Sequence, residues 1–150
     1  LLTDATPPDP IVEQLLDPSF EIDPVGTYST SSQMTNWEVI SGEWDLVTSF
    51  DGLSPNDGSK FLVGTDTFDT GELRQEIDLV ASGFSAERID MNVMKAYFSI
   101  QRANANNELD LGRVRVELLN AADDIISTAL ATGWEPGSYT HLTLPTTHYV

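Results

Sequence analysis

The 150-residue chain contains no cysteine and only two histidines. Without cysteine there are no disulfides, no thiolate metal sites and no cysteine nucleophiles, although secretion is not excluded. Both histidines, His141 and His148, lie in the C-terminal stretch SYTHLTLPTTHYV. The rest of the chain therefore offers neither a Ser-His-Asp triad nor the usual ligands of a zinc ion.

Positive charge is also scarce, with 7 Lys and Arg against 24 Asp and Glu and a net charge of −17. Such a surface repels phosphate backbones and anionic lipids, so we expect neither nucleic acid nor a membrane surface as a partner. No apolar run is long enough to span a bilayer, and we expect no membrane insertion. A solvated acidic surface is the simplest reading of the charge.

The chain divides into a short leading segment and a body. The motif TPPDP fixes an extended backbone, so residues 1–14 are predicted to be a linker or the end of a preceding region. From residue 15 to residue 137, short apolar runs alternate with Gly, Pro, Asn, Asp and Ser, without a sustained helical period. This pattern predicts an all-β domain, an antiparallel jelly-roll β-sandwich.

Three segments show which side chains face the core. WEVISGEWDLV predicts two strands around Ser41-Gly42, while ELRQEIDLV and GRVRVELLN alternate apolar and charged residues. The predicted inward positions are Trp37, Val39, Trp44 and Leu46 in the first segment, Leu73, Gln75, Ile77 and Leu79 in the second, and Val114, Val116 and Leu118 in the third. The run 125–130 fits a strand or a helical turn, and we favour a strand.

The last thirteen residues, 138–150, differ from the body because they contain no acid and four threonines. Taken alone, THLTL could form one more strand. However, Ser138 to Thr147 resembles, without a gap, the translation of a sequencing-library adaptor. We therefore interpret residues 138–150 as a non-native tail and expect that the last strand of the natural domain is missing.

Several motifs occur in an order that resembles galactose-binding-like β-sandwich modules, which include many carbohydrate-binding modules. DPSFE at residues 17–21 matches the opening strand, and Asn36-Trp37 stands where Gly-Trp is usual. The Asp57-Gly58 turn, the strand LRQEIDL and the late strand VRVELLN also match. Asn120 replaces the usual Asp of the late strand, and the Gly that follows it in the family is missing. The resemblance covers nearly all of residues 15–137.

The resemblance implies a structural calcium ion, bound by Glu21 with help from Asp23. Calcium takes six to eight oxygen ligands, so carbonyl groups and another acid would have to complete the site. The alternative is that Glu21 caps or pairs locally.

A glycan site needs an exposed aromatic face and polar groups for the hydroxyls. We expect the strand of Tyr97 to form a hairpin with residues 113–118. This hairpin would place a ligand-binding set on one outward face: Tyr97, Gln101, Arg113 and Arg115. The arginines could instead pair with nearby acids, which is the commoner outcome. Phe50 and Leu53, near a turn, are a second option, since Trp37 and Trp44 are predicted to be core residues.

The resulting expectation is a non-catalytic carbohydrate-binding module that binds a polysaccharide or other glycan. It would belong to a larger extracellular bacterial protein and lie beside other domains of that chain. One alternative is a structural or adhesive module that binds protein partners. Another is a glycan-active enzyme using two of the abundant carboxylates, which would require a buried pair in one cleft.

Overall fold

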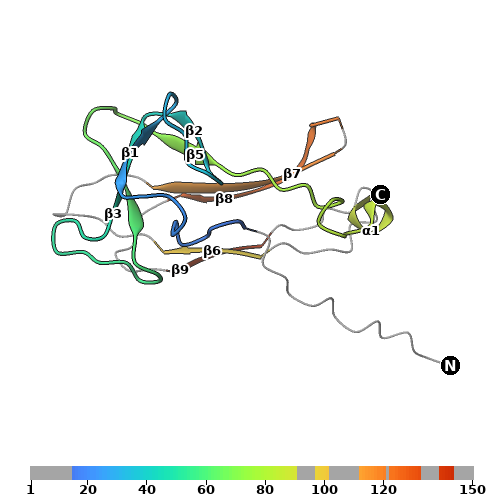
Figure 1. Ribbon diagram of the computed structural model, residues 1–150. Coiled ribbons are helices and arrows are strands. Elements are labelled where there is room, and N and C mark those ends of the chain that lie inside the picture. The colour runs from blue at the N-terminus through green and yellow to red at the C-terminus, as the bar shows by residue number, and fades with distance from the viewer. Residues whose placement is uncertain (1–14, 91–96, 102–111, 121, 133–138, 144–150) are drawn as a thin grey trace.

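The computed structural model describes residues 15–90, 97–101, 112–120, 122–132 and 139–143 (Figure 1). The predicted linker, 1–14, lies outside them. The elements are β1 Gly26–Ser29, β2 Glu38–Ser41, β3 Glu43–Val47, β4 Phe61–Gly64, β5 Glu72–Arg74, α1 Ala86–Asp90, β6 Tyr97–Gln101, β7 Arg113–Leu119, β8 Ile125–Thr132 and β9 Tyr139–Thr143. All strand pairings among them are antiparallel. The all-β prediction is confirmed for the described residues, with α1 as a single helical turn.

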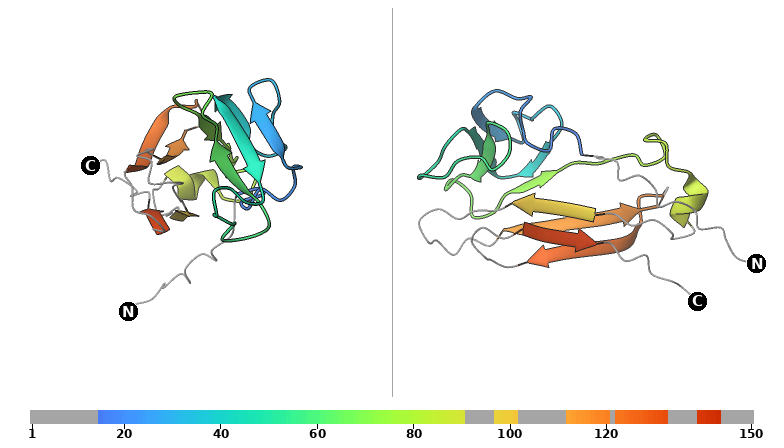
Figure 2. Two further views of the ribbon diagram at one scale, coloured as in Figure 1. Left: turned by 90° about the vertical axis from the view of Figure 1, so that its left-hand side faces the viewer. Right: turned by 90° about the horizontal axis from the view of Figure 1, so that it is seen from below.

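The strands form one three-stranded sheet, β1-β3-β4, and three two-stranded sheets, β2-β5, β6-β9 and β7-β8. The β7-β8 and β6-β9 pairs run along the molecule as two layers, and β8 contacts β9 (Figures 1 and 2). The β2-β5 pair lies beside β7 on the upper side of Figure 1. No helix in the described part of the chain is long and apolar enough to cross a membrane.

The segment WEVISGEWDLV forms two strands around Ser41-Gly42, as predicted. β2 pairs with β5, whereas β3 pairs with β1 and β4, so the chain changes sheets at Gly42. The φ angle of Gly42 is +74°, and a Cβ atom there would lie 2.7 Å from the Cα of Gly71. Only glycine accommodates both the left-handed backbone and this close approach.

The main core lies between the β1-β3-β4 sheet and β2. Its buried side chains are Tyr28, Met34, Val39 and Leu46, with Phe20, Trp37, Trp44, Leu62 and Leu73 packed around them. All four inward positions predicted in WEVISGEWDLV are therefore confirmed. A second cluster joins Val114 and Ala129 with Ile100 and Val116, which links β6 to the β7-β8 pair.

The predicted alternation in ELRQEIDLV is also observed. Leu73, Gln75, Ile77 and Leu79 are half-buried, while Arg74, Glu76 and Asp78 are exposed. Only Glu72–Arg74 pairs as a strand, so the alternating pattern extends beyond β5. The ambiguous run 125–130 lies in strand β8, in agreement with the favoured reading.

The predicted hairpin between the strand of Tyr97 and residues 113–118 is wrong. β7 pairs with β8, and a tight turn joins them in which the Asn120 side chain accepts hydrogen bonds from the backbone N–H groups of Ala122 and Asp124, each at 2.9 Å. Closing this short loop costs less conformational entropy than closing the longer connection from β6. β6 pairs instead with β9, the strand that THLTL was able to form. The adaptor origin of residues 138–150 stays a prediction.

Candidate functional site

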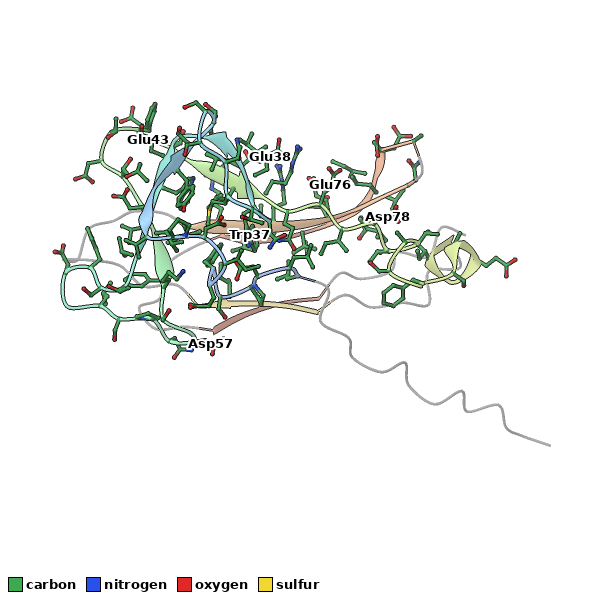
Figure 3. All side chains as sticks on the ribbon, in the orientation of Figure 1. Trp37, Glu38, Glu43, Asp57, Glu76 and Asp78 are labelled. Atoms are coloured by element: carbon green, nitrogen blue, oxygen red, sulfur yellow. The ribbon has the colours of Figure 1, made fainter. Side chains whose placement is uncertain are left out.

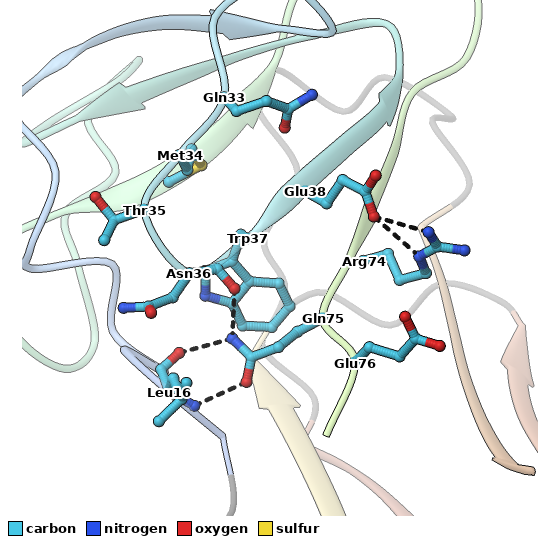
Figure 4. Close-up of a pocket in the computed structure, with 10 residues that line it drawn as sticks. All are labelled: Leu16, Gln33, Met34, Thr35, Asn36, Trp37, Glu38, Arg74, Gln75 and Glu76. Atoms are coloured by element: carbon cyan, nitrogen blue, oxygen red, sulfur yellow. Dashed lines mark hydrogen bonds and ion pairs between the residues drawn. The ribbon is translucent and has the colours of Figure 1, made fainter. Parts of the chain in front are cut away.

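An open groove of about 340 Å³ lies beside the β2-β5 pair (Figure 4). Its walls come from three segments far apart in sequence: the start of the described chain, the residues that lead into β2, and β5 with the residues after it. The residues that line it include Leu16, Asn36, Trp37, Glu38, Arg74, Gln75 and Glu76. They combine an aromatic ring, amides, two carboxylates and a guanidinium group.

Glu38 and Arg74 lie opposite each other on β2 and β5. The Arg74 guanidinium donates from Nη2 to Glu38 Oε2 at 2.7 Å and from Nε at 3.3 Å. This hydrogen bond and the charge of Glu38 raise the pKa of Arg74 above its ordinary value. Both side chains are about half exposed, so water screens the pair and it contributes little to stability. Its polar atoms remain accessible from the groove.

Gln75 fixes one wall of the groove (Figure 4). Its Oε1 accepts from the Leu16 N–H at 2.8 Å, and its Nε2 donates to the Leu16 carbonyl at 2.8 Å and to the Asn36 carbonyl at 2.9 Å. A side-chain amide thus binds the Leu16 backbone as a neighbouring strand would. These bonds explain why a polar residue occupies the half-buried row of ELRQEIDLV.

Trp37 belongs to both the core and the groove. Its Nε1 donates to the Asp17 carbonyl at 3.1 Å, and its ring centroid lies 5.1 Å from that of Phe20. The indole is half-buried and packs against the main core, as predicted. It also lines the groove, near Glu38 and Glu76 in Figure 3. These contacts hold the ring in place on the groove wall.

The predicted ligand-binding residues fall on two strands. Arg113 and Arg115 are exposed on β7, while Tyr97 and Gln101 belong to β6, and their side chains lie outside the described structure. Arg115 contacts Glu117 at 3.1 Å and reaches Glu72 on β5 at 4.0 Å. The alternative that the arginines pair with acids is confirmed for Arg115. This pairing extends the row of charges that begins with Glu38 and Arg74 onto β7.

The second predicted option, Phe50 and Leu53, forms a tight turn. The two residues exchange backbone hydrogen bonds of 3.1 and 2.8 Å, and the central Asp51 and Gly52 both have positive φ angles. Positive φ at both central residues is typical of a two-residue hairpin turn. Phe50 is 38% exposed.

Glu21, one of the two predicted calcium ligands, forms hydrogen bonds with the turn at Gly58. Its carboxylate accepts from the Ser59 N–H at 2.7 Å, the Ser59 hydroxyl at 2.5 Å and the Lys60 N–H at 3.0 Å. A Cβ atom on Gly58, whose φ is +70°, would lie 2.4 Å from Glu21 Oε1, so glycine is needed for this contact. Glu21 thus pairs within the fold, with a turn 38 residues away in the sequence.

Asp23, the second predicted ligand, is buried and binds a different segment. Its carboxylate accepts from the Thr35 N–H at 2.9 Å and from the Thr35 hydroxyl at 2.5 Å. The Lys60 ammonium donates to the carbonyls of Glu21 and Asp23 at 2.9 and 2.5 Å. In this arrangement the Lys60 ammonium lies between the two carbonyls. Within the described residues, no group of three Asp, Glu or His side chains is placed to hold a metal ion.

The hydrogen bonds of the Glu21 carboxylate predict how the stability of the fold depends on pH. Two hydrogen bonds from Ser59 lower the pKa of Glu21 below its ordinary 4.5. The bond from the Ser59 side chain has the larger effect, and the bond from its backbone N–H follows. A lowered pKa in the folded state stabilises the fold above the unfolded-state pKa, and this contribution disappears as the pH falls through the folded-state value. We expect Glu21→Gln to have a lower Tm than the parent at neutral pH, with the difference shrinking below pH 4.5. A difference in Tm that is constant across this range would contradict the role given to Glu21.

The groove itself was not predicted from the sequence. The signal that could have indicated it is Gln75, a polar residue in an inward-facing row, which implies a buried polar contact. Neither a family model, nor a curated protein, nor a solved structure matches this chain. The resemblance to galactose-binding-like modules therefore stays a prediction based on the motifs.

Proposed function

We propose that this chain is a non-catalytic carbohydrate-binding module of the galactose-binding-like jelly-roll type, part of an extracellular bacterial protein, and that it binds a glycan in the groove beside β2-β5. The observation that carries the proposal is the combination of an aromatic ring with accessible charged groups in one open groove. A sugar presents an apolar C–H face and a rim of hydroxyls. Trp37 offers a surface for the first, and Glu38, Arg74 and Glu76 offer hydrogen-bond partners for the second.

Exposure of the groove carboxylates favours binding over catalysis. Glu38 and Glu76 are both exposed. A carboxylic acid that protonates a glycosidic oxygen is typically held in an apolar pocket, where burial raises its pKa. Exposed carboxylates can accept hydrogen bonds from sugar hydroxyls, which is the role proposed for Glu38 and Glu76 here.

Truncation of the groove charges is expected to weaken glycan binding. A hydrogen bond to a charged group contributes about 1.5–3 kcal/mol, so Glu76→Ala and Arg74→Ala should each raise the Kd about tenfold or more. Glu87→Ala, an exposed acid on α1, is the matched control and should leave the Kd unchanged. Affinity electrophoresis and calorimetry with a panel of soluble polysaccharides measure the Kd of the groove variants and of the control. The proposal fails if no glycan binds, or if the control weakens binding as much as the groove variants.

An adhesive or structural module is the second candidate, and one surface favours it. Ile126 and Leu130 on β8 are 42% and 54% exposed, and their spacing places them on one face of the strand. Exposed apolar side chains on a strand can contact another protein surface. Absence of glycan binding, together with association that Leu130→Lys abolishes, would favour this candidate.

Calcium at Glu21 and Asp23 is a separate proposal, in which the ion displaces the ammonium of Lys60. Calcium at about 100 times its Kd would stabilise the fold by about 2.7 kcal/mol. Lys60→Met opens the carbonyls of Glu21 and Asp23, so calcium should raise the Tm of this variant more than that of the parent. Scanning calorimetry with calcium and with EDTA measures the effect. Identical melting in both conditions, for parent and variant, would exclude a calcium site here.

A further inference from the structure

The charges around the groove are not balanced. Arg74 is bonded to Glu38 at 2.7 Å, and the nearby Glu76 and Glu72 further raise its pKa. Arg115, the next cation along this surface, is held by Glu117 at 3.1 Å and approaches Glu72 at 4.0 Å. Both arginines therefore already face carboxylates, and their charge is largely offset before any ligand arrives.

Glu76, unlike Glu38, is not paired directly with an arginine of the described residues. It is exposed, lines the groove, and makes no hydrogen bond or ion pair within the described part of the chain (Figure 4). The charge that the groove leaves for a ligand is thus negative, in a protein whose net charge is already −17.

From this imbalance we infer that the groove selects glycans that carry free amino groups and rejects glycans that carry carboxylates or sulfates. A protonated amino group on a sugar forms a charge-assisted hydrogen bond with Glu76, which is stronger than the bond from a neutral hydroxyl. A uronate or sulfate placed there meets a carboxylate of like charge, and such contacts suppress binding. The neighbouring Trp37 contacts the apolar face of the same sugar ring. The inference deepens the proposed function and rests on it.

Paired oligosaccharides that differ only in acetylation test the inference. Oligomers of glucosamine and of N-acetylglucosamine have the same backbone, but only the former carries amino groups. They are titrated calorimetrically at a mildly acidic pH, where the amine of glucosamine is protonated, beside galacturonic acid oligomers. We expect the glucosamine oligomer to bind about tenfold more tightly than its acetylated counterpart, and the uronate not to bind.

Two variants distinguish the effect of the charge in the groove from the effect of the net negative charge of the whole protein. Glu76→Gln should bring the ratio of the two affinities close to one, whereas Glu87→Gln, which removes the same charge from α1, should leave the ratio unchanged. A ratio that Glu76→Gln does not alter, or uronate binding at least as tight as glucosamine binding, would overturn the inference and leave the proposed function standing. Absence of binding by every oligomer would also overturn the inference, whereas the proposed function fails only if no polysaccharide of the wider panel binds.

Discussion

Replacing Gln75 with leucine is expected to lower the free energy of unfolding by about 1–3 kcal/mol, although leucine has nearly the same volume. The substitution removes three hydrogen bonds and leaves the Leu16 N–H, the Leu16 carbonyl and the Asn36 carbonyl without the partner they have in the fold. The bond to the Asn36 carbonyl is part-buried, so its loss costs most, whereas water can reach the exposed backbone groups of Leu16. Urea unfolding followed by tryptophan fluorescence measures the change.

The neighbouring variant Glu76→Gln is the control for this experiment. Its side chain is exposed and points to solvent in the groove, so its effect on stability should stay within about 0.5 kcal/mol. If Gln75→Leu destabilised the protein no more than Glu76→Gln, Gln75 would not be the residue that fixes the groove wall.

Leu46→Ala is expected to have an effect of similar or larger size. Leu46 is completely buried in β3, the central strand of the β1-β3-β4 sheet, and packs within the main core. Removing a buried leucine side chain costs about 2–5 kcal/mol, because transfer free energy is lost and a cavity remains. Domains of this size are stable by only about 5–15 kcal/mol, so the variant should show a large shift of its urea midpoint.

Leu130→Ala provides the matched control, since Leu130 is 54% exposed on β8. The same substitution there should change stability by about 0.5 kcal/mol or less. Equal losses for Leu46→Ala and Leu130→Ala would mean that the core does not lie where the structure places it.

The sequence predicted which faces of the strands are buried but not which strands pair. The period of two in WEVISGEWDLV and ELRQEIDLV follows from the geometry of a strand, so Val39, Leu46 and Leu73 were identified correctly. Pairing depends on loop closure and on the surfaces of other strands, which the pattern of one strand does not contain. For this reason the partner of β6 was predicted wrongly, and the partner observed is β9.

The candidate site was predicted less well, for a related physical reason. Glu21 was identified as a functional carboxylate, but its partners Ser59 and Lys60 lie 38 and 39 residues away, and no local rule connects them. Gln75 was assigned to the inward row, yet its bond to the backbone of Leu16 spans 59 residues. A groove built from three distant segments becomes visible only when the fold brings them together.

The most direct test of the proposed binding groove is a chemical-shift titration of the ¹⁵N-labelled protein with glucosamine and N-acetylglucosamine oligomers. The indole N–H of Trp37 and the side-chain amide of Gln75 are predicted to shift together as ligand is added, because both groups line the groove. The indole N–H of Trp44, which is buried against Gly71, should not move and serves as an internal reference. Unchanged Trp37 and Gln75 signals at saturating ligand, or shifts confined to other residues, would contradict glycan binding in this groove.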